Sequence, residues 1–286
     1  MITRIITVGP QRLGNLLLTL CFDHYLNPRP EHTVVITPLD VAVVHQIISD
    51  YHPELSVAVV ADHKLAENYD LSQWQDQKNL RAGWLRQQAL KLVALDCIDT
   101  DLFLIQDPDT FCIQNYTWYS QGSCILAVQE NQSHYSGYYQ TLETVLGITR
   151  QTNNSFVTEF MPCYKQDWMA CRDRIEQIID RNWTNLIDYV PLENFGRHCQ
   201  VRWFSEYELL GNWQSWLRPT QQVIQKRFVY NSIESLEDLN TTYTVVCDRG
   251  PHGQIRGLPS LFGDQLTVDF QAIDQAKQIL RNKQIC

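Results

Sequence analysis

The sequence predicts an α/β fold in which a mostly parallel sheet is flanked by helices. Three short apolar runs rich in β-branched residues, at 4–8, 33–37 and 56–61, lack strict alternation, as expected of strands buried on both faces. Between them, residues 13–25 and 40–51 carry apolar side chains at helical spacing. This alternation of strands and helices implies parallel strands with helices on the faces of the sheet.

A longer helix and another buried strand follow these first elements. Residues 83–97 predict a helix, because Leu85, Ala89 and Leu92 fall on one apolar stripe. The apolar strand 102–105 comes next and runs into Asp107-Pro108-Asp109. Beyond it the pattern is less regular, and the remaining expected elements are strands at 124–128 and 243–246, helices ending at 146 and covering 166–179 and 205–217, and a turn-rich loop at 248–253. No linker or internal repeat appears, so we expect one domain over residues 1–286.

Composition and charge exclude several classes of protein. The chain has 286 residues and a formal net charge of −9, and its basic residues are scattered, so no nucleic-acid partner is expected. No apolar run reaches the roughly 18–20 residues that span a bilayer, and the N-terminus is typical of a first strand rather than a signal peptide. The nine cysteines are dispersed without a Cys-x-x-Cys pair, which favours reduced thiols, a cytoplasmic location and no structural zinc site.

Two aspartates, Asp107 and Asp109, follow the predicted strand 102–105. In an open parallel sheet, ligands bind beyond the carboxyl ends of the strands. Pro108 fixes its own φ and favours an extended Asp107, so the two carboxylates can point the same way. Such a pair supplies hard oxygen ligands for Mg²⁺ or Mn²⁺, with substrate phosphates and waters completing the coordination shell.

The Asp-x-Asp pattern is not specific by itself, since it arises by chance in chains of this size. The sequence contains a second example, Asp99-Thr100-Asp101. This triplet precedes the apolar strand, so we expect it at the opposite end of the sheet, where it caps a helix or a turn. Position relative to the strand therefore distinguishes the two, and it favours Asp107 and Asp109 as the metal ligands.

Several sequence blocks surround this motif in order. They are Gly-Trp-Leu-Arg-Gln-Gln-Ala-Leu-Lys-Leu at 83–92, Asp-Leu-Phe-Leu-Ile-Gln-Asp-Pro-Asp-Thr at 101–110, Phe-Met-Pro at 160–162 and Phe-Ser-Glu-Tyr-Glu at 204–208. Together they resemble a little-characterised group of bacterial and viral proteins that are predicted to be glycosyltransferases of the GT-A fold. The resemblance covers most of the chain, with its distinctive features confined to these blocks.

The resemblance implies a metal-dependent hexosyl- or related transferase with a Rossmann-like central sheet. Its donor would be a nucleoside diphosphate sugar, with UDP the expected nucleotide, and its acceptor a glycan or another hydroxyl compound. Residues 1–115 would form the nucleotide-sugar-binding half, and residues 116–286 an irregular acceptor-binding half. Mn²⁺ or Mg²⁺ would neutralise charge that develops on the leaving diphosphate.

Within this frame, five further residues are candidates for binding the donor or for a structural role. Gly9, at the end of the first strand, would let the nucleotide approach the backbone closely. Asp40 and Asp62 follow the second and third strands, where a carboxylate can bind ribose hydroxyls or a base, although a helix-capping role is favoured for Asp40. Arg86 and Lys91 would reach the donor phosphate or sugar, with solvated helix charges as the alternative.

The later part of the chain supplies candidates for the remaining roles. In related GT-A enzymes a late-loop histidine often completes the metal site, and here His252 is favoured over His134. Arg249 lies in the same loop as His252, which suits a flap over a diphosphate. Glu206 follows a predicted Ser205 N-cap and is the candidate general base for an inverting transfer, the alternative being a first-turn glutamate that the helix dipole favours.

Other function classes stay open at this point. A nucleotidyltransferase or a dehydrogenase usually carries a glycine-rich phosphate loop, whereas residues 8–14 contain neither the Walker lysine nor a Gly-x-Gly-x-x-Gly pattern. A non-catalytic carbohydrate-binding protein of the same fold is the third alternative, and the intact Asp-x-Asp motif argues against it.

Overall fold

A five-stranded sheet forms the centre of the protein in a computed structural model that describes residues 1–75, 82–129, 136–195, 199–220, 223–225, 228–229, 245–247, 261 and 268–283. The strand order is β11-β5-β1-β3-β4. These strands are β1 (Ile2–Thr7), β3 (His32–Thr37), β4 (Val57–Ala61), β5 (Leu102–Gln106) and β11 (Phe160–Tyr164). All neighbours pair in parallel except β11, which lies antiparallel to β5 at the edge. The predicted mostly parallel sheet is confirmed.

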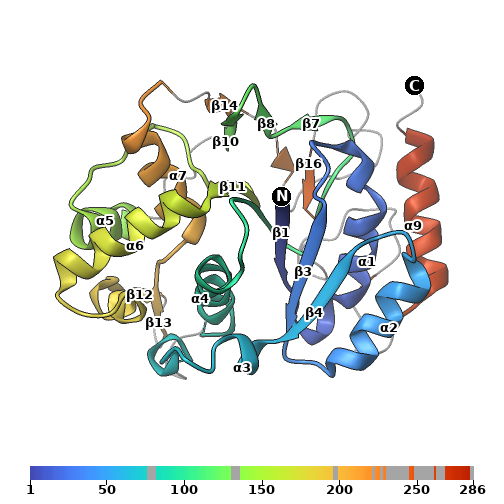
Figure 1. The fold of residues 1–286 in the computed structure, drawn as a ribbon, viewed down its shortest axis with the longest axis horizontal. Coiled ribbons are helices and arrows are strands. Elements are labelled where there is room, and N and C mark those ends of the chain that lie inside the picture. The colour runs from blue at the N-terminus through green and yellow to red at the C-terminus, as the bar shows by residue number, and fades with distance from the viewer. Residues whose placement is uncertain are drawn as a thin grey trace.

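Helices cover both faces of this sheet (Figure 1). One face carries α1 (Leu13–Cys21), α2 (Val41–Tyr51) and α9 (Phe270–Lys283), and the other carries α4 (Ala82–Cys97), α5 (Ser136–Leu146), α6 (Lys165–Ile179) and α7 (Glu206–Leu217). Successive residues of β1 serve the two cores, because Ile5 packs with the α4 side and Ile6 with the α1 side. Burial on both faces explains why these strands read as continuous apolar runs.

The remaining elements are short. The strands are β2 (Leu26–Asn27), β6 (Thr110–Cys112), β7 (Tyr116–Thr117), β8 (Tyr119–Ser120), β9 (Ser123–Cys124), β10 (Leu126–Val128), β12 (Leu192–Phe195), β13 (Cys199–Arg202), β14 (Val223–Gln225), β15 (Phe228–Val229) and β16 (Val245–Cys247). The helices are α3 (Asp62–Leu65) and the 3₁₀ turns η1 (Pro10–Arg12), η2 (Asp23–Tyr25), η3 (Ser72–Gln75) and η4 (Trp183–Tyr189). Most of the short strands fall after β5, in the half that the sequence predicts to be irregular.

Some predicted boundaries differ from the structure. The helix expected at 13–25 ends at Cys21 and continues as the 3₁₀ turn η2. The strand expected at 124–128 is divided into β9 and β10, because β9 pairs with β8 whereas β10 pairs with β14. The late strand lies at Val245–Cys247 and pairs with β6. The predicted loop at 248–253 lies outside the described residues.

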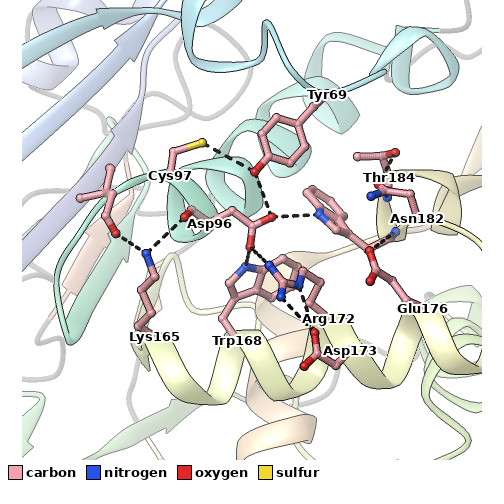
Figure 2. Close-up of polar contacts among 12 residues, drawn as sticks. Tyr69, Asp96, Cys97, Lys165, Trp168, Arg172, Asp173, Glu176, Asn182 and Thr184 are labelled. Carbon is pink, nitrogen blue, oxygen red and sulfur yellow. Dashed lines mark hydrogen bonds and ion pairs between the residues drawn. The ribbon is translucent and has the colours of Figure 1, made fainter.

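A buried carboxylate joins α4, α6 and η4 at the end of α4 that precedes β5 (Figure 2). The Asp96 carboxylate accepts hydrogen bonds from the indole nitrogens of Trp168, at 2.6 Å, and Trp183, at 3.0 Å. The Tyr69 hydroxyl donates at 3.3 Å, and the Arg172 guanidinium approaches to 3.3 Å. The Asp96 side chain is only 4% exposed, so these four donors replace the hydrogen bonds to water that the carboxylate loses on burial.

The described part of the chain contains no helix long and apolar enough to cross a membrane. Its six cysteines with described side chains are free thiols: Cys21, Cys97, Cys112, Cys124, Cys163 and Cys171.

Candidate active site

Three carboxylates meet at the carboxyl edge of the central sheet. Asp107 and Asp109 follow β5, as predicted, and Glu159 precedes β11. Because β11 runs antiparallel to β5, its first residues lie beside the last residues of β5, with Phe160 opposite Gln106. One ligand oxygen from each of the three side chains lies within 4.8 Å of the others. This is the only such group of three or more acidic, histidine or cysteine side chains among the described residues.

Hydrogen bonds hold the backbone of this loop in place. The Asp107 N–H donates to the Glu159 carbonyl at 3.2 Å, and the Thr110 N–H donates to the Asp107 carbonyl at 3.3 Å. The Thr19 hydroxyl on α1 donates to the Pro108 carbonyl at 2.7 Å. The turn that carries both aspartates is therefore tied to β11 on one side and to α1 on the other.

Glu159 is the ligand candidate that the sequence analysis missed. It is 5% exposed and adopts a φ of +61°, in the left-handed region that residues other than glycine seldom occupy. Backbone outliers of this kind cluster at functional sites, where the surrounding structure holds them. The sequence block Phe160-Met161-Pro162 could have pointed to Glu159, because Glu159 directly precedes it and the block lies in β11.

The Lys91 ammonium group lies behind Asp107 and is 1% exposed. It donates to Asp107 Oδ1 in a close contact, to Glu206 Oε1 at 2.7 Å and to the Tyr207 hydroxyl at 3.2 Å. The Tyr207 hydroxyl in turn donates to Asp107 Oδ1 at 2.8 Å. An ammonium group has three hydrogens, so these partners use the full donor capacity of Lys91 inside the protein. The sequence predicts that Lys91 reaches the nucleotide-sugar donor, whereas in the structure its ammonium group contacts Asp107.

Burial and charge decide the protonation states of this cluster. Burial alone would lower the pKa of Lys91, but the carboxylates of Asp107 and Glu206 raise it. Burial would likewise raise the pKa of Asp107, but the Lys91 ammonium holds it below its usual range. Glu206 is different, since burial and the neighbouring Asp107 charge raise its pKa against the opposing effect of Lys91. Asp107 is thus kept ionised, as a metal ligand must be.

Glu206 begins α7 and is fully buried. The Ser205 side chain caps the helix by accepting from the Glu208 N–H at 3.4 Å, as the sequence predicts. The Glu206 carboxylate contacts Lys91. The side-chain amide of Gln88 lies 3.4 Å from the backbone nitrogen of Glu206. In this structure Glu206 therefore faces α4 rather than solvent.

Arg12 is a second cation at the site that the sequence analysis did not single out. It ends η1, the turn that follows β1 and Gly9, and its guanidinium lies 3.1 Å from Asp109 Oδ2. The Arg12 side chain is 24% exposed, so unlike Lys91 it is partly accessible to solvent. Each aspartate of the motif thus has its own cationic neighbour.

Asp62, Arg86 and Gly9 lie on neighbouring elements at this edge. Asp62 is the first residue of α3, directly after β4, and Arg86 on α4 forms an ion pair with it at 3.1 Å. A Cβ added to Gly9 would lie 3.7 Å from Gln87 Nε2, an ordinary contact, so packing does not by itself require glycine there. Asp40 caps α2 by accepting from the Ala42 and Val43 N–H groups, which confirms the favoured structural role.

Three predicted site residues, His134, Arg249 and His252, lie outside the described residues. The second Asp-x-Asp triplet precedes β5, at the opposite end of the strand from Asp107. Its Thr100 hydroxyl donates to the Met1 carbonyl, and Asp99 and Asp101 are both exposed. The expectation that this triplet lies at the opposite end of the strand from Asp107 and Asp109 is confirmed.

A family model described as a family of unknown function, DUF6492, matches residues 11–243. The chain belongs to this family. The match includes Asp107, Asp109, Glu159 and Glu206, whereas α9 lies beyond it.

No curated protein matches the chain in sequence. Among solved structures, it is similar to mouse xyloside xylosyltransferase 1 in its apo form, with a TM-score of 0.48 and 9% identity over 87% of this chain and 98% of that chain. At this level of likeness, the activity of the protein has to be argued from its own site.

Proposed function

We propose that this protein is a metal-dependent glycosyltransferase that moves a sugar from a nucleoside diphosphate sugar to a hydroxyl acceptor. The observation that carries the proposal is the convergence of Asp107, Asp109 and Glu159 at the carboxyl edge of a parallel sheet. Ligands bind at this edge in open α/β sheets. The resemblance of the sequence blocks to predicted glycosyltransferases supplies the reaction class.

The donor set fits a small divalent cation. Three carboxylates from two chain segments offer hard oxygen ligands, which suit Mg²⁺ or Mn²⁺ and leave positions for phosphate oxygens and waters. When bound, the cation would neutralise the charge that develops on the leaving diphosphate. His252 remains a further proposed ligand.

The residues around the metal site would hold the donor. Arg12 is partly exposed beside Asp109, so its guanidinium is placed to bind a phosphate of the donor. Asp62 follows β4 and pairs with Arg86 of α4, and both would contact the nucleotide there, while Gly9 would admit it close to the end of β1. Arg249 is proposed as a further phosphate contact.

For Lys91 and Glu206 the geometry favours roles other than those expected from the sequence. Glu206 was the candidate general base, yet its carboxylate is fully buried against Lys91. A base must lie within hydrogen-bonding reach of the acceptor proton. We therefore propose that Glu206 holds Lys91 and that Lys91 holds Asp107, so both support the metal site from inside the protein.

The proposal is tested by thermal denaturation with UDP-, GDP- and CMP-sugars, with and without Mn²⁺. One donor should stabilise the protein in the presence of Mn²⁺, by about 2.7 kcal/mol at a donor concentration one hundred times its Kd. Release of UDP or GDP from that donor, followed in the same samples, separates a transferase from a non-catalytic binder, and a response to CMP-sugars alone, whose leaving group is the monophosphate CMP, would contradict the proposed diphosphate donor. A protein that responds to none of these donors is not this kind of enzyme.

The two Asp-x-Asp triplets provide a matched pair of variants. Asp109→Asn should abolish the metal-dependent stabilisation, because it removes an anionic ligand from the site. Asp101→Asn makes the same chemical change on the exposed triplet at the other end of β5 and should behave like the wild type. Equal responses from the two variants would refute the assignment of the metal site.

A further inference from the structure

One oxygen of Asp107 is already occupied by two donors. Lys91 Nζ and the Tyr207 hydroxyl both donate to Oδ1. An ionised carboxylate has about four lone-pair positions, two on each oxygen, so these two bonds fill the positions on Oδ1. Both donors are buried, with Lys91 1% and Tyr207 2% exposed, and solvent does not compete for them.

The two donors also support one another. Lys91 donates to the Tyr207 hydroxyl at 3.2 Å and lies 4.7 Å from the centre of its ring. Glu206 takes the third hydrogen of the ammonium at 2.7 Å. Lys91 comes from α4, which precedes Asp107 in the chain, and Tyr207 comes from α7, which follows it. The two helices together fix the rotation of the Asp107 carboxylate.

We infer that Lys91 and Tyr207 are positioning residues that make Asp107 a one-oxygen ligand, so that the site selects a small octahedral cation over Ca²⁺. With Oδ1 filled, a cation can bind only Oδ2. Single-oxygen carboxylate ligation suits octahedral Mg²⁺ and Mn²⁺, whereas Ca²⁺ takes six to eight oxygens and commonly binds both oxygens of a carboxylate. The inference rests on the metal site of the proposed function and adds a metal preference to it.

Tyr207→Phe tests the inference, because it removes the hydroxyl and keeps the ring beside Lys91. Affinities for Mn²⁺ and Ca²⁺ are measured by calorimetric titration of the full chain without any donor. Partners that orient metal ligands typically contribute about 10–100-fold to affinity, so Mn²⁺ binding should weaken about tenfold. The affinity for Ca²⁺ should fall by a smaller factor, because a position on Oδ1 becomes open to this ion. The preference for Mn²⁺ over Ca²⁺ should therefore shrink.

Asp96→Asn is the matched control. It alters a buried carboxylate near the C-terminal end of α4, whose hydrogen-bond partners lie on α6, on η4 and at Tyr69 (Figure 2), and therefore perturbs the same helix without removing a partner of Asp107. It should leave the ratio of the two affinities unchanged. If Tyr207→Phe leaves the Mn²⁺ affinity unchanged, or lowers the affinities for both ions by the same factor, the positioning role of Tyr207 is overturned.

Wild-type protein provides a test that does not depend on a variant folding. It should bind Mn²⁺ more tightly than Ca²⁺, and equal or tighter Ca²⁺ binding overturns the inference. A wild type that prefers Mn²⁺ but responds to no nucleotide sugar would refute the proposed transferase activity while leaving the metal preference standing. A wild type that binds neither ion refutes both.

Discussion

Glu159 combines a strained backbone with a buried charge at the proposed metal site. A residue held in a sparsely populated backbone region costs of order 1–3 kcal/mol, and three carboxylates close together also repel one another. Glu159→Gln removes one of the three charges without changing the size of the side chain. We expect the metal-free variant to be at least as stable as the wild type, with Mn²⁺ affinity reduced tenfold or more, because even a partner that only orients a metal ligand contributes about 10–100-fold. Melting curves with and without Mn²⁺ measure both effects, and an undiminished Mn²⁺-induced shift would exclude Glu159 as a ligand.

Glu208, two residues after Glu206, gives the protein a pH-dependent element away from the metal ligands. Its carboxylate is 1% exposed and accepts from the Ser155 hydroxyl at 2.6 Å, the Phe156 N–H at 3.2 Å and the Asn212 amide at 3.0 Å. Burial nevertheless raises the pKa of Glu208, against the effect of these bonds.

The sign of the resulting pH dependence follows from this raised pKa. A group whose pKa is higher in the folded than in the unfolded state contributes stability below its unfolded pKa, and that contribution is lost as the pH rises through the folded pKa. The free energy of unfolding of the wild type, relative to Glu208→Gln, should therefore fall as the pH rises from about 5 to about 8. Urea denaturation of both proteins across that range measures the difference. A difference that stays constant or grows would contradict the raised pKa.

Some site residues were predictable because the neighbouring sequence determines their position in the fold, whereas others depend on contacts between distant parts of the chain. Asp107 and Asp109 follow an apolar strand directly, so chain order alone places them at the carboxyl edge. Glu159 joins them only because an antiparallel edge strand returns to β5, and Tyr207 only because α7 packs behind that strand. Such long-range pairings leave no local spacing pattern. The side-chain direction of Glu206, toward Lys91, is likewise a product of packing rather than of sequence position.

At the scale of elements, the strands buried on both faces were the easiest to predict. Their apolar, β-branched runs are long enough to stand out, and they recur between helical segments. β11 was missed because it contains Pro162, which has no N–H for a central ladder. Its position at the edge of the sheet removes that objection, since one side of an edge strand has no strand partner.

The Asp96 cluster joins three elements through one carboxylate and gives a prediction at this scale. Asp96→Asn keeps the shape but removes the charge that the Arg172 guanidinium faces, and it replaces an acceptor oxygen with a donor beside two indole N–H groups. A buried polar group without its partner costs about 1–3 kcal/mol, so we expect a loss of that size in the free energy of unfolding. Urea denaturation of the variant measures it. Asp173→Asn, which alters an exposed partner of the same arginine, should stay within about 0.5 kcal/mol of the wild type, and equal losses would refute the cluster's role.

At the scale of the whole molecule, the sheet separates two cores that have different tasks. The core on the α4 side contains the helices that carry Lys91 and Tyr207 to Asp107, at the proposed metal site. The core on the other side is closed by α9, whose Ile273 and Leu280 are buried against α1 and α2. α9 lies beyond the residues that match the family, yet it packs against α1 and completes this core.

This division predicts that stability and metal binding can be changed separately. Ile273→Ala should lower the free energy of unfolding by about 2–5 kcal/mol, because it opens a cavity at a fully buried position. Gln275→Ala changes an exposed residue of the same helix and should be close to neutral. Mn²⁺ affinity, measured by titration at a temperature where the Ile273→Ala protein remains folded, should stay close to that of the wild type, because α9 packs on α1, across the sheet from the helices α4 and α7 that carry Lys91 and Tyr207. A clearly weaker Mn²⁺ affinity in the folded variant would mean that packing in the α9 core also sets the geometry of the aspartate turn, through α1 and its Thr19–Pro108 hydrogen bond.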